Sequence, residues 1–307
     1  MQGEKRYLLL KKEKHLLFIL LVTISFFYHS FQRTERIDWD VFGYYLYLPA
    51  KFIHNDINLG RKTEWLEPAI SKYKLTDSFY QAYQSPSRKY VFKYTMGMSV
   101  LYSPFFFAAD AFVRNTNLYE RDGFSLPYQI AMRFFVFTMI LLGLFYLYKT
   151  LRIYFSENNT LFALFLLVFG TNYYVMSFAD GLMPHLSLFT LFSILLFYTI
   201  QWYQQQKIKF AAIIGVCLGM AVLIRPTSAV VVLIPILWGV YGIQAFSVRM
   251  LLLLSNFRQL LILILLAFTV LLPQLLYWHT QTGEWLFYSY PDEKLNFFKP
   301  HLAEVFF

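Results

Sequence analysis

The sequence predicts an all-α protein, a polytopic bundle of membrane-spanning helices. Of its 307 residues, 58% are apolar and 15% are charged, and the mean hydropathy is +0.45, which is too apolar for a soluble domain. Several runs, among them LFALFLLVFG and LLILILLAFTVLL, are apolar on every side, whereas the strands of a membrane barrel alternate in polarity. We therefore expect helices that cross the bilayer.

The first span follows a basic N-terminus. Lys and Arg residues between Lys5 and Lys14 precede an uncharged run from His15 to Phe31. Because no small-x-small cleavage site follows that run, we expect a retained span rather than a cleaved signal peptide. Residues 1–31 are thus predicted to form the cytoplasmic N-terminus and the first span, and the chain then emerges on the outer face.

The segment after this span, IDWDVFGYYLYLPA, combines two acids with three tyrosines at positions 44, 45 and 47. Asp38 and Asp40 lie where the chain should enter water. Tyrosine suits a lipid-water boundary, where its ring is buried and its hydroxyl is wet, so the tyrosines are interpreted as an interfacial belt. The acids are either solvated parts of that belt or members of a functional site.

Residues 32–126 are predicted to be an external loop with amphipathic juxtamembrane helices, because patches such as RKTEWLEPAISKYKLTDSFYQ are too polar to span. Within the loop, the stretch Lys93–Val113 is apolar, but Pro104 interrupts it and it carries Asp110. We expect this stretch to lie on the membrane surface and not to cross.

The positions of the basic loops support that choice. Residues 127–280 are predicted to form six further spans, at about 128–148, 160–178, 185–203, 210–224, 228–246 and 259–278. If Lys93–Val113 crossed as well, every short basic loop would move outside, against the positive-inside rule. We therefore expect about seven crossings in all. The basic loop residues are Lys149, Arg152, Lys207, Lys209, Arg249 and Arg258.

Four ionisable residues fall at the outward ends of the predicted spans, on the side of Asp40: Arg133, Asp180, His185 and Arg225. Ionisable groups at membrane depth cost at least about 2.5 kcal/mol and usually face a cavity or one another. Taken singly, the two arginines could snorkel, Asp180 could cap its turn and His185 could be a satisfied interfacial histidine. Together they indicate a polar site at the outer face.

Other classes of site find little support. The formal charge of +9 gives no reason to expect a nucleic-acid partner, since basic residues of membrane proteins gather in cytoplasmic loops. Cys217 is the single cysteine and lies in an apolar run, which excludes a disulfide framework or a cysteine metal site. Asp40 has no second ligand of clear geometry, so we expect no metal and no other cofactor. Residues 281–307 are expected to begin an external loop, as if the chain were the N-terminal part of a longer protein.

Short motifs along the chain resemble the GT-C class of integral-membrane glycosyltransferases, which includes the protein O-mannosyltransferases and the lipid A aminoarabinose transferases. The motifs are FGYYLYLPAKFI after Asp40, KYTMGMSVLYSPFF in the loop, LPYQIAMR, FADGLMPHLSLF and GMAVLIRPTSAVVVL. The resemblance implies juxtamembrane helices in the first loop, a shared module of about seven helices, and a loop carboxylate at the reaction centre.

It further implies transfer of a sugar from a polyprenyl-phosphate donor to a lipid, glycan or protein acceptor at the outer membrane face. Asp40 would be the general base, and Asp38 a further substrate-binding acid. On a helix the two carboxylates would point about 200° apart, so their pairing would need an extended segment. The remaining substrate-binding candidates are three cations for the donor phosphate, Lys93, Arg133 and Arg225, and two orienting residues, Asp180 and His185.

Two other functions stay open from the sequence. A transporter or lipid flippase would use polar helix ends to line a pathway, but it predicts ionisable residues near the middle of the membrane. A non-catalytic membrane subunit is favoured if no further spans follow Phe307.

Overall fold

The computed structural model describes residues 15, 17–28, 37–85 and 89–289. Within these residues the chain is helical almost throughout, and the one sheet is an antiparallel hairpin of β1 (Ala82–Gln84) and β2 (Tyr90–Phe92). The all-α membrane class predicted from the sequence is confirmed. The N-terminal basic residues, and most of the predicted segment 281–307, lie outside the described residues.

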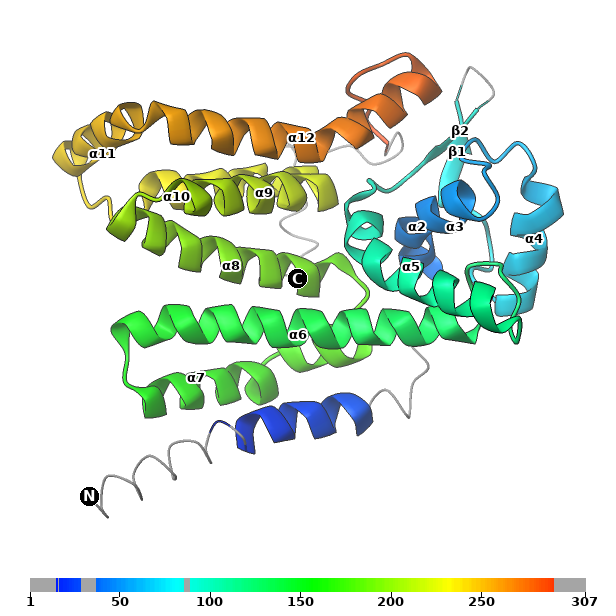
Figure 1. The fold of residues 1–307 in the computed structure, drawn as a ribbon, viewed down its shortest axis with the longest axis horizontal. Coiled ribbons are helices and arrows are strands. Elements are labelled where there is room, and N and C mark those ends of the chain that lie inside the picture. The colour runs from blue at the N-terminus through cyan, green and yellow to red at the C-terminus, as the bar shows by residue number, and fades with distance from the viewer. Residues whose placement is uncertain (1–14, 16, 29–36, 86–88, 290–307) are drawn as a thin grey trace, which may run out of the picture.

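The long helices form a layered bundle. Its main members are α6 (Leu126–Tyr154), α7 (Glu157–Gly170), α8 (Pro184–Gln205), α9 (Ile208–Ile224) and α12 (Phe257–Thr282). Figure 1 shows them side by side with their axes nearly parallel, in the order α7, α6, α8, α9, α12, and the N-terminal helix Leu17–Tyr28 lies beyond α7. By length and composition α6, α8 and α12 can each cross a membrane, and α7 and α9 are shorter apolar helices. The number of crossings remains a prediction.

Helices α9 and α12 approach one another closely because α9 presents two glycines one turn apart. A Cβ atom on Gly215 would lie 2.4 Å from the carbonyl oxygen of Leu263, and one on Gly219 would lie 2.7 Å from that of Ala267. Small residues spaced by four let helix backbones meet in a membrane, where packing rather than the hydrophobic effect holds helices together.

The predicted span 228–246 is not one helix. It is divided into η2 (Pro226–Val232), a 3₁₀ segment, α10 (Leu233–Leu237) and the first residues of α11 (Ile243–Ser255). Proline lacks the backbone N–H that an α-helix needs, and both Pro226 and Pro235 fall in this region. Gly239 then takes a positive φ of +71°, which turns the chain before α11.

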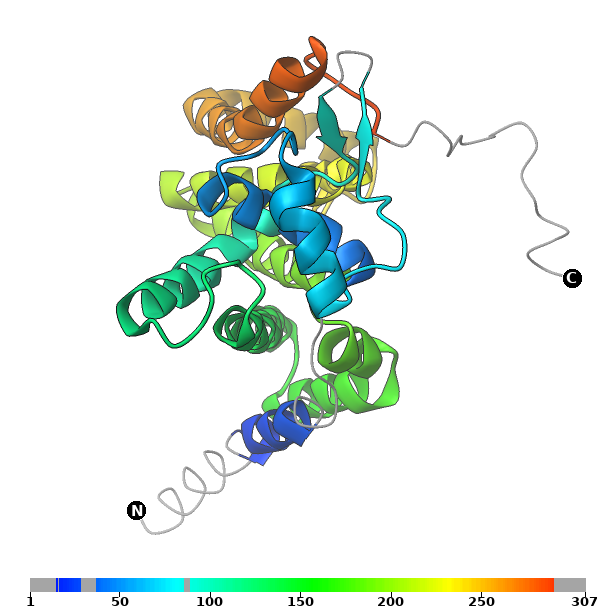
Figure 2. The same ribbon diagram turned by 90° about the vertical axis from the view of Figure 1, so that its right-hand side faces the viewer.

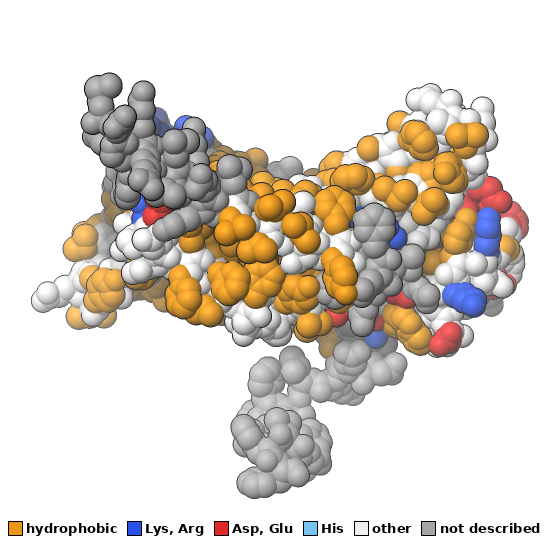
Figure 3. Space-filling view, turned by 90° about the horizontal axis from the view of Figure 1, so that it is seen from below, with side chains coloured by type: hydrophobic (Ala, Val, Ile, Leu, Met, Phe, Trp, Pro, Cys, Tyr) orange, Lys and Arg blue, Asp and Glu red, His pale blue; other side chains and the backbone are white. Residues whose placement is uncertain are grey.

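The segment 37–124 folds into a compact end module at one end of the bundle. Besides the hairpin it contains α2 (Trp39–Tyr45), α3 (Tyr47–Phe52), α4 (Lys62–Tyr73) and α5 (Gly97–Thr116). Figures 1 and 2 show α5 among these short helices, at the end of the bundle and outside the row of parallel helices. Seen from below, apolar side chains cover the middle of the bundle, and charged side chains gather at the right-hand end, where the end module lies (Figure 3).

Aromatic rings form the core of the end module. Three of these rings are fully buried: Tyr45, Phe106 and Phe124. The ring centroids of both phenylalanines lie within 6 Å of that of Tyr45. The hydroxyl of Tyr45 donates to the carbonyl of Gly123 over 2.6 Å. The interpretation of Tyr44, Tyr45 and Tyr47 as an interfacial belt is therefore wrong, because all three side chains are buried inside the protein.

A short segment, residues 92–97, docks the end module onto the bundle. The N–H of Phe92 donates to the Tyr277 hydroxyl (3.0 Å), and the N–H of Met96 donates to Oε1 of Gln274 (2.8 Å), so both bonds reach α12. The Thr95 hydroxyl donates to the carbonyl of Ile224, the last residue of α9. These bonds fix the end module against the ends of α9 and α12.

Candidate active site

Asp40 lies in the first turn of α2, and two phenols hold its carboxylate. The hydroxyl groups of Tyr80 and Tyr94 both donate to Oδ1 of Asp40, over 2.6 and 2.7 Å. Tyr80 lies in the loop before β1, and Tyr94 is the second residue after β2. The hairpin region therefore lies against the start of α2. Two donors on one oxygen orient the carboxylate.

These phenols remain protonated near neutral pH. Burial, together with the hydrogen bond to Asp40, raises the pKa of Tyr80 to about 12, and the same two causes raise the pKa of Tyr94. A protonated phenol can only donate to a carboxylate, so both groups act as fixed donors throughout the physiological range.

Tyr94, which donates to Asp40, contacts Tyr44, on which Arg225 acts. The Tyr44 and Tyr94 rings lie 4.3 Å apart, and Tyr44 is almost fully buried. Burial raises the pKa of the Tyr44 hydroxyl, Arg225 opposes this through its charge and a hydrogen bond, and the charge of Asp40 adds to the rise. Asp40 and Arg225, which are far apart in the sequence, thus act on the same hydroxyl group.

The local sequence explains the position of Arg225. This residue follows the last turn of α9 with an extended backbone (φ −142°, ψ 114°), the conformation expected of a residue that precedes a proline. The sequence IRP therefore ends the helix and directs the arginine towards the end module. The Arg225 and Asp180 charges both act on the ring of His185, an exposed residue in the first turn of α8.

Lys93 adds a second cation beside Asp40. Its Nζ lies 5.6 Å from the ring centroid of Tyr80 and 5.9 Å from that of Tyr94, the two tyrosines that hold the carboxylate. An ammonium group near two aromatic rings gains a favourable cation–π attraction. The site therefore contains one acid, several phenols and two cations.

The remaining predicted members are Asp38 and Arg133. Asp38 precedes α2 with an extended backbone, while Asp40 is already helical, so the pair straddles the start of the helix. Arg133 lies on α6, one turn from Val136, which packs against Gly181 beside Asp180. The guanidinium Nε of Arg133 is buried, and within the described part of the chain it has no hydrogen-bond partner.

Tyr80 and Tyr94 are the site residues that the sequence analysis missed. Neither belongs to a recognisable motif of its own, although Tyr94 falls inside the quoted stretch KYTMGMSVLYSPFF. Among the residues that the structure describes, no three His, Cys, Asp or Glu side chains gather into a potential metal site. This observation leaves a metal requirement untested.

The family model of the dolichyl-phosphate-mannose-protein mannosyltransferases matches residues 127–278, about half of the chain. No curated protein and no solved structure matches. The helical membrane fold and this match support a GT-C-type glycosyltransferase, and the matching family supports glycosyl transfer from a polyprenyl-phosphate donor in general. Within that class, its bundle is similar to the dolichyl-phosphate-mannose-protein mannosyltransferases.

The match begins at the second residue of α6 and ends in the last turns of α12. It therefore includes four of the predicted site residues, Arg133, Asp180, His185 and Arg225. Asp40 and Lys93 lie in the end module, outside the match. An enzyme of this class is favoured over the transporter and over the non-catalytic subunit that the sequence left open.

Proposed function

We propose that the chain transfers a sugar from a polyprenyl-phosphate donor to an acceptor hydroxyl at the outer membrane face, with Asp40 as general base. The observation that carries the proposal is the Asp40 carboxylate held by the Tyr80 and Tyr94 hydroxyl groups, with Nζ of Lys93 within 6 Å of both ring centroids. The Tyr94 ring contacts that of Tyr44, on which Arg225 acts. A base and two cations at the end of a helix bundle match the needs of a lipid-linked donor, whose phosphate lies at headgroup depth.

In this mechanism Oδ2 of Asp40 accepts the proton of the acceptor hydroxyl as that oxygen forms a bond to the anomeric carbon. The bond between this carbon and the phosphate oxygen breaks, and the electron pair leaves with the polyprenyl phosphate. Arg225 and Lys93 stabilise the charge that develops on the leaving phosphate, because charge-assisted hydrogen bonds strengthen as that charge grows. Tyr80 and Tyr94 keep the carboxylate in place through Oδ1.

The outward orientation is supported by the distribution of basic residues. The last turns of α6, the turn between α8 and α9 and the start of α12 lie at the end of the bundle opposite the end module (Figure 1), and they contain Lys149, Lys207 and Arg258. Since short basic loops remain in the cytoplasm, that end is the cytoplasmic one, and the Asp40 site then faces outwards.

The main test compares Asp40→Asn with Asp38→Asn. Both proteins are expressed in membranes that contain the acceptor, and transfer from a radiolabelled polyprenyl-phosphate sugar is measured at equal protein level. Removing a general base typically slows a reaction by about 10² to 10⁴, so Asp40→Asn should retain less than about a hundredth of the activity. A loss confined to Asp38→Asn would assign the base to Asp38.

A second test addresses the donor phosphate. Arg225→Lys keeps the charge but loses the planar fork that binds two phosphate oxygens, so donor use should fall, whereas a snorkelling arginine tolerates lysine. The matched control is Arg258→Lys at the opposite end of the bundle. Full activity in Arg225→Lys would remove Arg225 from the donor site.

A further inference from the structure

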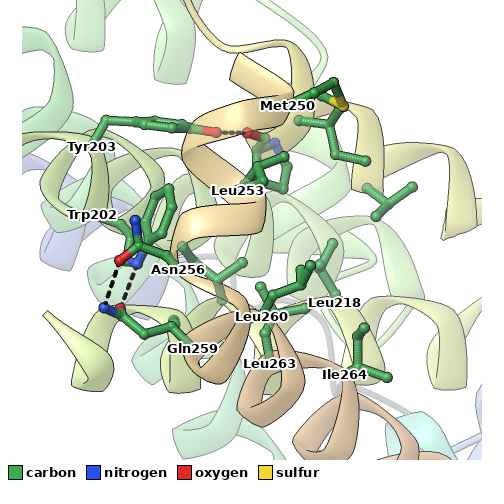
Figure 4. Close-up of a pocket in the computed structure, with 15 residues that line it drawn as sticks. Trp202, Tyr203, Leu218, Met250, Leu253, Asn256, Gln259, Leu260, Leu263 and Ile264 are labelled. Atoms are coloured by element: carbon green, nitrogen blue, oxygen red, sulfur yellow. Dashed lines mark hydrogen bonds between the residues drawn. The ribbon is translucent and has the colours of Figure 1, made fainter. Parts of the chain in front are cut away.

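An apolar cavity of about 300 Å³ lies between α8, α9, α10, α11 and α12, on the side of the bundle away from the Asp40 site. Figure 4 shows the residues that line it, among them Leu218, Leu253, Leu260, Leu263 and Ile264. Its volume falls at the lower end of small-molecule pockets, which measure about 300 to 1,000 Å³. A cavity of this size suits part of a single hydrocarbon chain.

The polar groups on the wall of the cavity are satisfied by one another. Oε1 of Gln259 accepts from the indole N–H of Trp202 (2.8 Å), and its Nε2 donates to the carbonyl of Gln206 (2.7 Å) and to Oδ1 of Asn256 (Figure 4). The Tyr203 hydroxyl donates to the carbonyl of Pro235. An apolar space whose polar neighbours are already paired offers water few partners, so it favours an apolar occupant.

A cation stands at the edge of this cavity. Cζ of Arg249 lies 3.5 Å from the ring centroid of Tyr203, and Tyr203 itself lines the cavity. The guanidinium donates through Nη2 to the carbonyl of Trp238, while its Nε is buried and, in the described part of the chain, has no hydrogen-bond partner. A buried N–H donor of a charged group calls for an acceptor, and a phosphate oxygen is a strong one.

The stretch of the chain that forms the cavity carries basic residues and no acidic ones. From Gly181 to Gly283 the sequence contains no Asp or Glu, and three further cations, Lys207, Lys209 and Arg258, flank the same end of the bundle. Helix α11, which carries Arg249, has an apolar sequence and no buried residues, so its outer side faces the surrounding lipid. The cavity is thus bordered by a helix that contacts lipid, and its walls come from a stretch of the chain that carries basic residues and no acids.

We propose that an anionic phospholipid binds here, with one acyl chain in the cavity and its phosphate on Arg249. Basic pockets between membrane helices on the cytoplasmic side hold anionic headgroups in this way. The site lies at the other end of the bundle from Asp40, so it does not depend on the proposed chemistry.

The test measures lipid binding to the purified, delipidated protein by native mass spectrometry. The probes are dioleoyl phosphatidylglycerol and dioleoyl phosphatidylcholine, which share their acyl chains and differ in headgroup charge. A cation near a membrane surface contributes about 1 kcal/mol, so Arg249→Gln should weaken phosphatidylglycerol binding about fivefold. It should weaken phosphatidylcholine binding less, because the choline cation of that lipid offsets its phosphate charge. Ile264→Trp, which fills the mouth of the cavity, should weaken both.

The matched control is Lys149→Gln, because Nζ of Lys149 also lies over an aromatic ring, 4.1 Å from the centroid of Phe197, but outside this cavity. Equal loss in Lys149→Gln and Arg249→Gln would show a general charge effect and overturn the proposal. Wild-type binding of both lipids in Ile264→Trp would overturn it as well. Displacement of phosphatidylglycerol by polyprenyl phosphate at equal concentration would make the cavity a donor-chain site instead and refute the phospholipid.

Discussion

Gly97 is the position where a single methyl group should disconnect the two halves of the active site. Gly97 begins α5, and a Cβ atom there would lie 2.5 Å from the N of Ile224 and 2.6 Å from the carbonyl carbon and oxygen of Leu223. All three neighbours are backbone atoms, so no side-chain rotation can relieve the clash. Because ordinary contacts begin at 3.4 Å, Gly97→Ala must separate the end module from α9 by about 0.9 Å.

That movement separates residues of the proposed mechanism. Lys93 and Tyr94 lie within the docking segment 92–97, and Arg225 directly follows Ile224. Overpacking of this kind costs about 1–3 kcal/mol of stability, and a misplacement of about 1 Å can lower a rate about a hundredfold. We therefore expect Gly97→Ala to insert into the membrane and unfold cooperatively, while sugar transfer drops by about two orders of magnitude.

The matched control is Gly60→Ala in the same module, since the nearest atom to its Cβ would be Oδ1 of Asp56 at 3.7 Å. Transfer is measured for both variants from a polyprenyl-phosphate sugar, and thermal unfolding is followed in the same detergent. If Gly97→Ala is as active as Gly60→Ala, the docking of residues 92–97 does not set the geometry of the site.

Two further predictions concern stability. Gly219→Leu places a side chain against the carbonyl of Ala267, so the unfolding temperature in detergent should fall, and an unchanged value would show that α9 and α12 do not depend on close contact. Burial would raise the pKa of Asp110, but its bonds to Arg121, Tyr128 and Arg114 lower it, so Asp110→Asn should cost about 1.5–3 kcal/mol at neutral pH. The difference in unfolding free energy between wild type and Asp110→Asn should stay constant above the ordinary carboxyl pKa near 4 and vanish as the pH falls through the lowered pKa of Asp110. Equal stability of the two proteins at pH 7 would contradict a stabilising role of the Asp110 carboxylate.

Much of the bundle could be predicted from the sequence because hydropathy acts locally. A run such as LLILILLAFTVLL is helical in a membrane whatever surrounds it, since its backbone groups have no other partners there. The break that begins at Pro226 has a sequence signal as well, namely Pro226, Pro235 and Gly239. The apolar residues between them nevertheless favour a single span when hydropathy alone is considered. The Gly215 and Gly219 pair predicts a close helix contact without indicating that α12 is the partner.

The site could be predicted only where one short segment determines it. The sequence IRP places Arg225 at a helix end, and the position of Asp40 after the first predicted span assigns it to the predicted external loop. The partners of Asp40 come from 40 and 54 residues further along the chain, and only the tertiary fold brings them to Oδ1. The burial of Tyr44 and Tyr45 has the same origin, because a boundary tyrosine and a core tyrosine have the same local sequence pattern.

The two halves of the proposed site belong to different parts of the structure, and this determines what a substitution between them should impair. Arg225, Asp180 and His185 belong to the helix bundle, whose residues match the mannosyltransferase family, whereas Asp40 and Lys93 belong to the end module. The contacts of residues 92–97 with α9 and α12 join the two halves beside the site, whereas α5 packs against α6 further away. Weakening those contacts should therefore separate the base from the phosphate-binding arginine while each half remains folded, which is a loss of catalysis and not of membrane assembly.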